Sequence, residues 1–262
     1  MDLGLSGRTA LVTGASTGIG LATARTLATE GVTIAIVARG VERLTQAADA
    51  MRRDGFTVQA IAGDMSRPDD VDRVCAEAVK RLGQVDILIN NAGSAPAGPF
   101  AKLSDADWQG AIDLKLMGYV RAARTLVPAM RGRKWGRVVN VIGRRGHVPG
   151  QSFTIGGAVN AALQNFTVAL ALDCAPDNVL VNTVNPGPIL TPRAADLRRQ
   201  KAATWGVSED EVTRRTVSRV PLARYGTPDE VAAAIAFLCG TPAAYITGAT
   251  INVDGGGAID PG

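Results

Sequence analysis

The sequence predicts an α/β fold in which helices cover both faces of a doubly wound, parallel, seven-stranded sheet, giving three layers in a single domain. Two observations lead to this prediction. Short apolar runs alternate with longer segments whose apolar residues recur at helical spacing. No linker-like stretch or change in composition divides the 262 residues. Because β-α-β connections are right-handed, this alternation places helices on both faces of the sheet.

Seven short apolar runs are the predicted strands. They cover residues 9–13, 32–38, 58–62, 85–90, 137–142, 179–185 and 249–253. Helical patterns fill the segments between them, and the clearest cover residues 19–29, 41–53, 69–82 and 161–172.

The long segment 186–221 departs from this alternation, because it is rich in arginine and has only a weak helical pattern over residues 194–203. It follows the carboxyl end of a strand, where open α/β sheets bind their ligands. We therefore expect residues 188–221 to form a flap that covers the substrate. The alternative is a solvated excursion without a role.

Composition excludes several classes of protein. The formal charge of +4 is spread along the chain and aromatic residues make up only 4%, so we expect no nucleic-acid partner. No run of 18 uninterrupted apolar residues and no signal-like start is present, so we expect no membrane partner. Three widely separated cysteines predict no metal site and a reduced, cytoplasmic setting.

A glycine-rich turn after the first predicted strand indicates a nucleotide site. A strand, this turn and a helix follow one another directly, so that the backbone can approach a pyrophosphate at the helix N-terminus. The predicted cofactor-binding residues of this turn are Gly14, Ser16, Thr17, Gly18, Ile19 and Gly20.

The end of the second predicted strand indicates which dinucleotide binds. An acidic residue there binds the ribose 2′-hydroxyl of NAD, whereas this chain has Ala38 and Arg39. A guanidinium can hold a 2′-phosphate through paired hydrogen bonds. Arg39 therefore favours NADP(H) over NAD(H), and a solvated arginine at a helix start is the alternative.

Several further motifs, taken with the glycine turn, resemble those of the short-chain dehydrogenase/reductase family over nearly the whole chain. They are Gly63-Asp64-Met65, Asn90-Asn91-Ala92-Gly93, Asn185-Pro186-Gly187-Pro188-Ile189-Leu190-Thr191 and Thr247 through Gly256. The resemblance implies a Rossmann fold. It also implies that Asp64 and Met65 meet the adenine, that Asn91, Ala92 and Gly93 line the adenosine side, and that the nicotinamide side is formed by Pro186, Gly187, Ile189 and Thr191.

The family resembled here ordinarily uses an Asn, a Ser, a Tyr and a Lys for catalysis. Counting from Trp108 and through the following motifs assigns these positions to Lys115, Gly143, Gly156 and Asn160 respectively. A register slipped by three residues brings Phe153 and Gly157 to the Tyr and Lys positions instead, and it supplies neither a phenol nor an ammonium. We therefore expect an atypical active site.

Lys115 is the first candidate for the polar group of this site, as proton donor or as stabiliser of an oxyanion. The alternative is a lysine that points to solvent or into a structural ion pair. Asn160 is expected to hydrogen-bond the nicotinamide ribose. The second catalytic candidate is His147, a proton shuttle or an exposed loop residue. Arg144, Phe153 and Gly156 are the predicted substrate-pocket residues, with Phe153 packing in the helix core as its alternative.

The sequence thus favours an NADP(H)-dependent oxidoreductase that acts on a small molecule and donates the proton in an unusual way. Two other readings stay open. One is an NADP(H)-binding sensor or scaffold without turnover, and the other is a non-redox enzyme on the same fold. The resemblance also implies a homotetramer or dimer formed through long helices.

Overall fold

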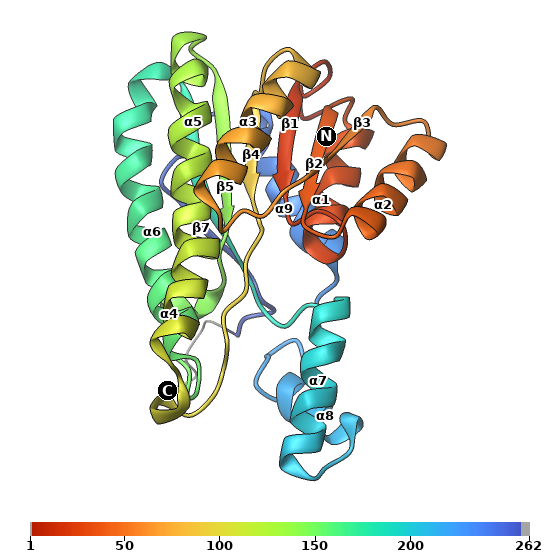
Figure 1. Ribbon diagram of the computed structural model, residues 1–262, viewed down its shortest axis with the longest axis vertical. Helices are drawn as coiled ribbons and strands as arrows, with labels where there is room; N and C mark the ends of the chain where they lie inside the picture. The colour runs from red at the N-terminus through yellow and green to blue at the C-terminus, as the bar shows by residue number, and fades with distance from the viewer. Residues whose placement is uncertain (1, 258–262) are drawn as a thin grey trace.

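The computed structural model describes residues 2–257 and contains a seven-stranded, fully parallel sheet in the order β3-β2-β1-β4-β5-β6-β7 (Figure 1). All seven predicted strands form, with ends shifted by at most two residues. Their bounds are β1 Thr9–Thr13, β2 Thr33–Ala38, β3 Val58–Ala62, β4 Ile87–Asn90, β5 Gly136–Val141, β6 Val179–Pro186 and β7 Thr250–Val253.

Helices cover both faces of the sheet, which confirms the predicted three layers. One buried cluster joins the sheet to α1, α2 and α9, and a second joins it to α3, α5 and α6 (Figure 1). The helices are α1 Gly18–Thr29, α2 Val41–Arg53, α3 Pro68–Leu82, α4 Asp105–Ala111, α5 Gly118–Gly132, α6 Thr154–Cys174, α7 Pro192–Trp205, α8 Glu209–Val217 and α9 Pro228–Cys239.

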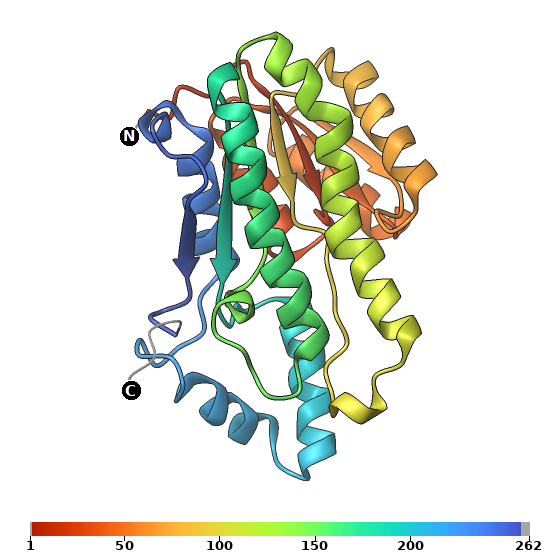
Figure 2. The same ribbon diagram turned by 90° about the vertical axis from the view of Figure 1, so that its left-hand side faces the viewer.

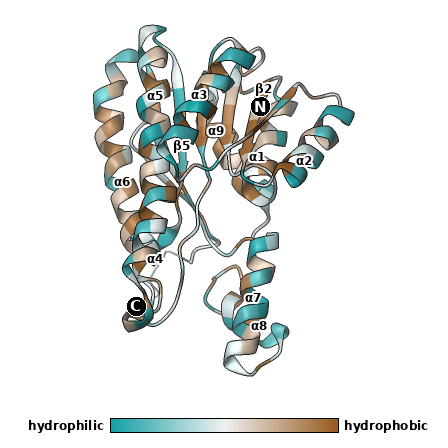
Figure 3. Ribbon diagram, in the orientation of Figure 1, coloured by the Kyte–Doolittle hydropathy of each residue, from teal (hydrophilic) through white to brown (hydrophobic). Residues whose placement is uncertain are grey.

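The central strands are apolar because they are enclosed on both sides. All five residues of β1 and all four of β4 are buried. Figure 3 shows hydrophobic residues concentrated in the middle of the sheet and on the helix faces turned toward it. Strands covered on both faces are continuous apolar runs in the sequence, which is why their positions could be predicted from it.

Polar side chains form a seam across the carboxyl ends of these strands. The Asn90 amide donates to Asn140 at 2.9 Å, and the Asn140 amide donates to Thr167 at 2.9 Å. Farther along the sheet, the Asn185 amide donates to Asn252 at 3.1 Å. These bonds tie β4 to β5 and α6, and β6 to β7, at the edge where the site lies, while the buried Asn90 Oδ1 has no hydrogen-bond partner within residues 2–257.

The strand order reverses direction between β1 and β4. The chain proceeds from β1 outward to β2 and β3, and then returns to β4 on the other side of β1. The loops that follow β1 and β4 therefore diverge and leave a crevice at the carboxyl ends of the strands, where doubly wound sheets bind dinucleotides.

Two helical segments differ from the prediction. Helix α6 begins at Thr154, seven residues before the expected start, and continues through Gly156 and Gly157. Two glycines oppose a helix locally, but Ile155 and Val159 are buried and their packing outweighs this preference. The 188–221 segment contains a second helix, α8, whose N-terminal Ser208 accepts a hydrogen bond from the Glu211 backbone at 3.2 Å. The sequence pattern of Ser208 and Glu211 is the capping signal that would have located it.

Helix α6 is long and largely apolar. Within residues 2–257, one helical segment, Thr154–Asp177, is long and apolar enough to cross a membrane by length and composition. In this fold the helix packs lengthwise along β6 (Figure 2). A long apolar helix is also what the core of an α/β domain requires, so the expected absence of a membrane partner stays a prediction.

A capping box fixes the start of α9, the helix that packs against α1. Thr227 accepts from the Glu230 backbone at 3.3 Å, and the Thr227 backbone donates to the Glu230 carboxylate at 2.7 Å. We expect Thr227→Ala to lower the free energy of unfolding by about 1 kcal/mol, measured by urea denaturation. Thr204→Ala is the matched control, because the Thr204 hydroxyl bonds only within its own exposed helix. Equal losses in both variants would contradict the assigned role of the cap.

Candidate active site

The glycine turn after β1 is shaped so that only glycine fits at its two ends. Gly14 has a φ of +66°, and a Cβ there would lie 2.8 Å from the Ala92 Cα. A Cβ at Gly20 would overlap the Gly14 carbonyl oxygen. The first turn of α1 carries no acidic residue. With no carboxylate at its start, the N-terminus of α1 suits the negative charge of a pyrophosphate.

Asn91 fastens this turn to the loop after β4. Its amide donates to the carbonyl oxygens of Thr13 and Gly14 at 3.0 and 3.1 Å. In return, the Thr13 hydroxyl accepts from the Asn91 and Ala92 backbones at 2.9 and 3.1 Å. These bonds hold the two diverging loops at a fixed separation.

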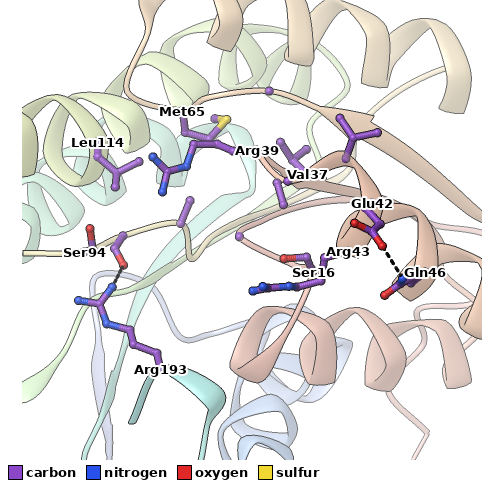
Figure 4. A pocket seen from close by; sticks show the side chains of 17 residues that line it. Ser16, Val37, Arg39, Glu42, Arg43, Gln46, Met65, Ser94, Leu114 and Arg193 are labelled. Atoms are coloured by element: carbon purple, nitrogen blue, oxygen red, sulfur yellow. Dashed lines mark hydrogen bonds between the residues drawn. The ribbon is translucent and has the colours of Figure 1, made fainter. Parts of the chain in front are cut away.

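A cleft of about 770 Å³ opens beside the turn (Figure 4). It brings together six of the seventeen residues predicted to bind the cofactor, from the loops after β1, β2, β3 and β4. Its lining comprises Gly14, Ser16, Val37, Ala38, Arg39, Gly40, Val41, Glu42, Arg43, Gln46, Gly63, Met65, Ala92, Gly93, Ser94, Leu114 and Arg193. The cleft is large enough for a drug-sized ligand.

Two arginines, not one, line the end of this cleft where β2 turns into α2. Arg39 lies 3.9 Å from the Asp64 carboxylate and keeps 69% of its side chain exposed. Arg43 and Ser16 both line the cleft, while Glu42 turns toward Gln46, which donates to it at 3.4 Å (Figure 4). The sequence prediction missed Arg43, although its place in the first turn of α2 was visible.

The loop after β6 reaches the same turn from the other side. A Cβ at Gly18 would lie 3.2 Å from the Thr191 Cγ2, so Thr191 borders the start of α1. Gly187 packs against Asp254, and Ile189 is buried. Arg193, which the sequence prediction did not single out, donates to the Gly93 carbonyl oxygen at 3.2 Å. Of the residues predicted for the nicotinamide side, Thr191 therefore lies next to the glycine turn, whereas Gly187 packs against Asp254.

Lys115 joins Gly143 and Asn160 in one hydrogen-bonded group. Its Nζ donates to the Asn160 Oδ1 at 2.7 Å and to the Ile142 carbonyl oxygen at 2.6 Å. The Asn160 amide donates to the Gly143 carbonyl oxygen at 3.2 Å. Lys115 comes from a π-helical turn, Ile112–Met117, a distortion that is frequent at functional sites.

Burial governs the charge of Lys115. The residue as a whole keeps some exposure, but protein surrounds its ammonium nitrogen, and this burial lowers the pKa of Lys115 to about 7. The positive charge of Arg193 adds to the lowering. A lysine nitrogen with two acceptors has one tetrahedral position left, which holds a proton in the ammonium and a lone pair in the amine. Near neutral pH this position can give or take a proton.

The Phe153 ring fills the space beside Gly156. A Cβ at Gly156 would overlap the Phe153 ring, so a larger residue there would require the phenyl group to move. None of the three tyrosines of the chain, all within the described residues, hydrogen-bonds to the Lys115 group. Tyr119 is buried and donates to the Val141 carbonyl oxygen at 2.9 Å, and Tyr245 is fully exposed.

Within the described residues, the side chains of His147 and Arg144 make no hydrogen bond to this group. The His147 side chain is exposed and makes no hydrogen bond within residues 2–257. Arg144 packs against Gly257, near the end of the described chain. The predicted set of site residues is therefore only partly assembled around Lys115. Among the described residues, no cluster of three His, Cys, Asp or Glu side chains could hold a metal.

Comparison with known proteins assigns the chain to a family. A family model described as short chain dehydrogenase matches residues 8–202. The chain belongs to this family. Family membership confirms the resemblance drawn from the motifs, and it makes the protein a member of a family of nucleotide-binding oxidoreductases.

Similar family members are reductases. A protein of Streptomyces virginiae described as a ketoacyl reductase of the monensin polyketide synthase is 37% identical over 254 residues, which cover 95% of this chain and 96% of that protein. The L-sorbose reductase of Gluconobacter frateurii, solved with NADPH and L-sorbose, superposes with a TM-score of 0.94 at 36% identity and covers 99% of this chain and 100% of its own. A variant of actinorhodin polyketide ketoreductase, solved with NADPH, gives 0.93 at 35%, with coverage of 99% and 100%.

The lowered pKa of Lys115 makes stability depend on pH. Between about pH 7 and pH 10 the unfolded chain holds a proton that the folded protein has released, so the free energy of unfolding rises with pH. We expect this rise, at most about 1.4 kcal/mol per pH unit, to be larger in the wild type than in Lys115→Met. Urea denaturation at pH 7, 8 and 9 measures it. Parallel curves for the two proteins would show that Lys115 stays charged.

Proposed function

We propose that this protein is an NADP(H)-dependent oxidoreductase of short-chain dehydrogenase type in which Lys115 serves as the proton donor or oxyanion stabiliser. The hydrogen-bonded group of Lys115, Ile142 and Asn160 carries the proposal. It supplies a titrating group near the cleft, where the family ordinarily uses a tyrosine and a lysine.

The chemistry divides between the cofactor and the chain. NADPH, when bound, supplies a hydride to the carbonyl carbon. Lys115 then offers the developing alkoxide a proton from its free tetrahedral position, and it is recharged from solvent because its pKa lies near neutrality. The carbonyl oxygen of Ile142 and the amide oxygen of Asn160 hold the nitrogen in place throughout.

Three observations support NADP(H) as the cofactor. Gly14 and Gly20 let the turn pack closely at the start of α1, where a pyrophosphate would lie. Arg39 and Arg43 line the part of the cleft after β2, where a 2′-phosphate would lie. The two similar solved reductases carry NADPH.

Removal of either arginine tests the cofactor proposal. We expect Arg39→Ala and Arg43→Ala each to weaken NADPH binding about tenfold, because each removes a charge-assisted hydrogen bond to phosphate worth about 1.5 kcal/mol. NADH binding, which lacks the 2′-phosphate, should change less than twofold. Fluorescence titration measures both, with Arg53→Ala as the control because Arg53 is exposed on the same helix. Equal weakening of NADPH and NADH would contradict a 2′-phosphate site.

Substitution of Lys115 tests the catalytic proposal. We expect Lys115→Met to lower kcat more than a hundredfold while NADPH affinity stays within threefold, because general acids contribute about 10²–10⁴-fold. Lys115→Arg keeps the charge but cannot release a proton, so substantial activity in that variant would favour oxyanion stabilisation over proton donation. A loss below tenfold in Lys115→Ala, with NADP(H) still bound, would overturn both roles.

A substrate panel distinguishes this proposal from the two other readings. Purified protein with NADPH is offered ketones, activated alkenes, quinones and imines, and NADPH oxidation is followed at 340 nm, its usual absorbance band. Turnover of any class supports an oxidoreductase with small-molecule substrates. Tight NADPH binding without oxidation on any class would favour a sensor, a scaffold or a non-redox enzyme.

The flap and the assembly are also proposals. Helices α7 and α8 lie together beyond the end of the sheet in Figures 1 and 2, which supports residues 188–221 as the cover of the substrate. Val168 and Leu172 of α6 are 45% and 73% exposed. An apolar helix face of this kind supports a homotetramer or dimer.

A further inference from the structure

Arg193 brings the flap into contact with the cofactor cleft. It is the second residue of α7, and among the flap residues that the structure describes it alone lines the cleft of about 770 Å³. Its Nη1 donates to the Gly93 carbonyl oxygen at 3.2 Å. Figure 4 shows its side chain extending from α7 toward the loop after β4, which carries Ser94. The flap therefore reaches the cleft through one guanidinium group.

The Arg193 guanidinium keeps most of its hydrogen-bond donors available. The group is a fork of several N–H donors, and within residues 2–257 Arg193 uses only its Nη1, toward Gly93. No carboxylate oxygen in this part of the chain lies within 4.0 Å of it. Asp196, one helical turn farther along, pairs instead with Arg199. Arg193 is exposed at the cleft, so its remaining donors can reach a ligand there.

The start of α7 lies beside the start of α1. Thr191, which precedes α7, places its Cγ2 3.2 Å from the position of a Cβ at Gly18, where α1 begins. The Thr191 hydroxyl accepts from the Ala194 backbone at 3.1 Å, which fixes the first turn of α7 in this place. The glycine turn and Arg193 therefore border the same cleft from two different segments.

Local electrostatics oppose an arginine at this position of a helix. A helix N-terminus carries a partial positive charge, which stabilises anions and repels cations. Arg193 stands in the first turn of α7, and neither that turn nor the first turn of α1 contains an acidic residue. An anion bound at the cleft would be attracted by both helix ends and by the guanidinium, and it would offset their mutual repulsion.

The cleft suits the two anionic parts of a phosphorylated dinucleotide. Arg39 and Arg43 line it after β2, where we propose the 2′-phosphate. Arg193 lines the same cleft together with Gly14 and Ser16 of the glycine turn. The glycine turn suits the second anionic part, the diphosphate, and the free donors of Arg193 are available to share it.

We infer that Arg193 is a ligand of the cofactor diphosphate and that this contact holds α7 against the loop after β4. The inference rests on the proposed dinucleotide site, but neither on the role of Lys115 nor on the preference for NADP(H). Arginine forms paired, charge-assisted hydrogen bonds with phosphate oxygens, and the free nitrogens of Arg193 supply the donors. The bound cofactor thereby fixes the flap before any substrate arrives.

Fragments of the cofactor separate the two anion sites. The protein is titrated calorimetrically with ADP, which carries the diphosphate, and with adenosine 2′-monophosphate, which carries only the other phosphate. We expect Arg193→Gln to weaken ADP binding about tenfold, or about 1.4 kcal/mol, and adenosine 2′-monophosphate binding less than about twofold. NADPH and NADH should both bind about tenfold more weakly, because both carry the diphosphate.

Two matched variants assign the effect to the Arg193 guanidinium. Arg199→Gln removes an arginine of the same helix that pairs with Asp196, so ADP affinity should change less than about twofold. Arg193→Lys keeps the charge but loses the paired geometry, so it should recover part of the ADP affinity. Unchanged ADP affinity in Arg193→Gln, or equal weakening of ADP and adenosine 2′-monophosphate, would overturn the inference.

Hydrogen exchange provides a second measurement, taken on the flap itself. At ADP concentrations that saturate each protein, ADP should slow exchange of the α7 backbone amides in the wild type but not in Arg193→Gln. Equal protection of α7 in the two proteins would show that the flap is not held through Arg193.

Lys115→Met separates this inference from the proposed function. Methionine keeps an unbranched side chain against Gly93, so the acceptor of Arg193 stays in place and ADP affinity should match that of the wild type. Weaker ADP binding in Arg193→Gln together with full turnover in Lys115→Met would support the diphosphate contact and refute the catalytic role of Lys115. Unchanged ADP binding in Arg193→Gln with an inactive Lys115→Met would refute this inference alone.

Discussion

The hydrogen bonds between the loops after β1 and β4 are the constraint on which the rest of the site depends. Asn91 and Thr13 bind each other's backbones and so hold the glycine turn at a fixed distance from the loop that carries Gly93. Gly93 lines the cleft, and the Lys115 stem packs against Gly93. The strand order sends the chain in opposite directions after β1 and after β4, and these part-buried bonds join the two loops.

Lys115 illustrates how a buried charge becomes chemically useful. An ammonium removed from water is costly unless acceptors replace the lost solvent, and here one carbonyl oxygen and one amide oxygen do so. Neither acceptor carries a full negative charge, so burial is not offset by an ion pair and the pKa falls to about 7. A carboxylate in place of Asn160 would have kept the lysine charged and unable to exchange its proton.

The charged side chains of the flap, residues 188–221, are arranged differently from Lys115. Arginines on its outer surface are neutralised by Asp and Glu neighbours one helical turn away or on the adjacent helix, and such exposed pairs contribute little to stability. Burial lowers the pKa of Arg145 and of Lys201, and the charges of nearby arginines lower both further.

The sequence by itself determined the seven strands, the glycine turn, the family and the position of Arg39 at the end of β2. These features depend on periodicity and on residues close together in the chain. It misjudged the start of α6 and missed α8, since burial of Ile155 and Val159 outweighed two glycines and a local cap was overlooked. Only the tertiary structure decided that Lys115 meets Asn160, 45 residues away, and that Phe153 fills the space beside Gly156. It also decided that the exposed His147 side chain makes no hydrogen bond to Lys115 or Asn160. Contacts of this kind depend on how remote segments pack in three dimensions, which no local pattern of residues specifies.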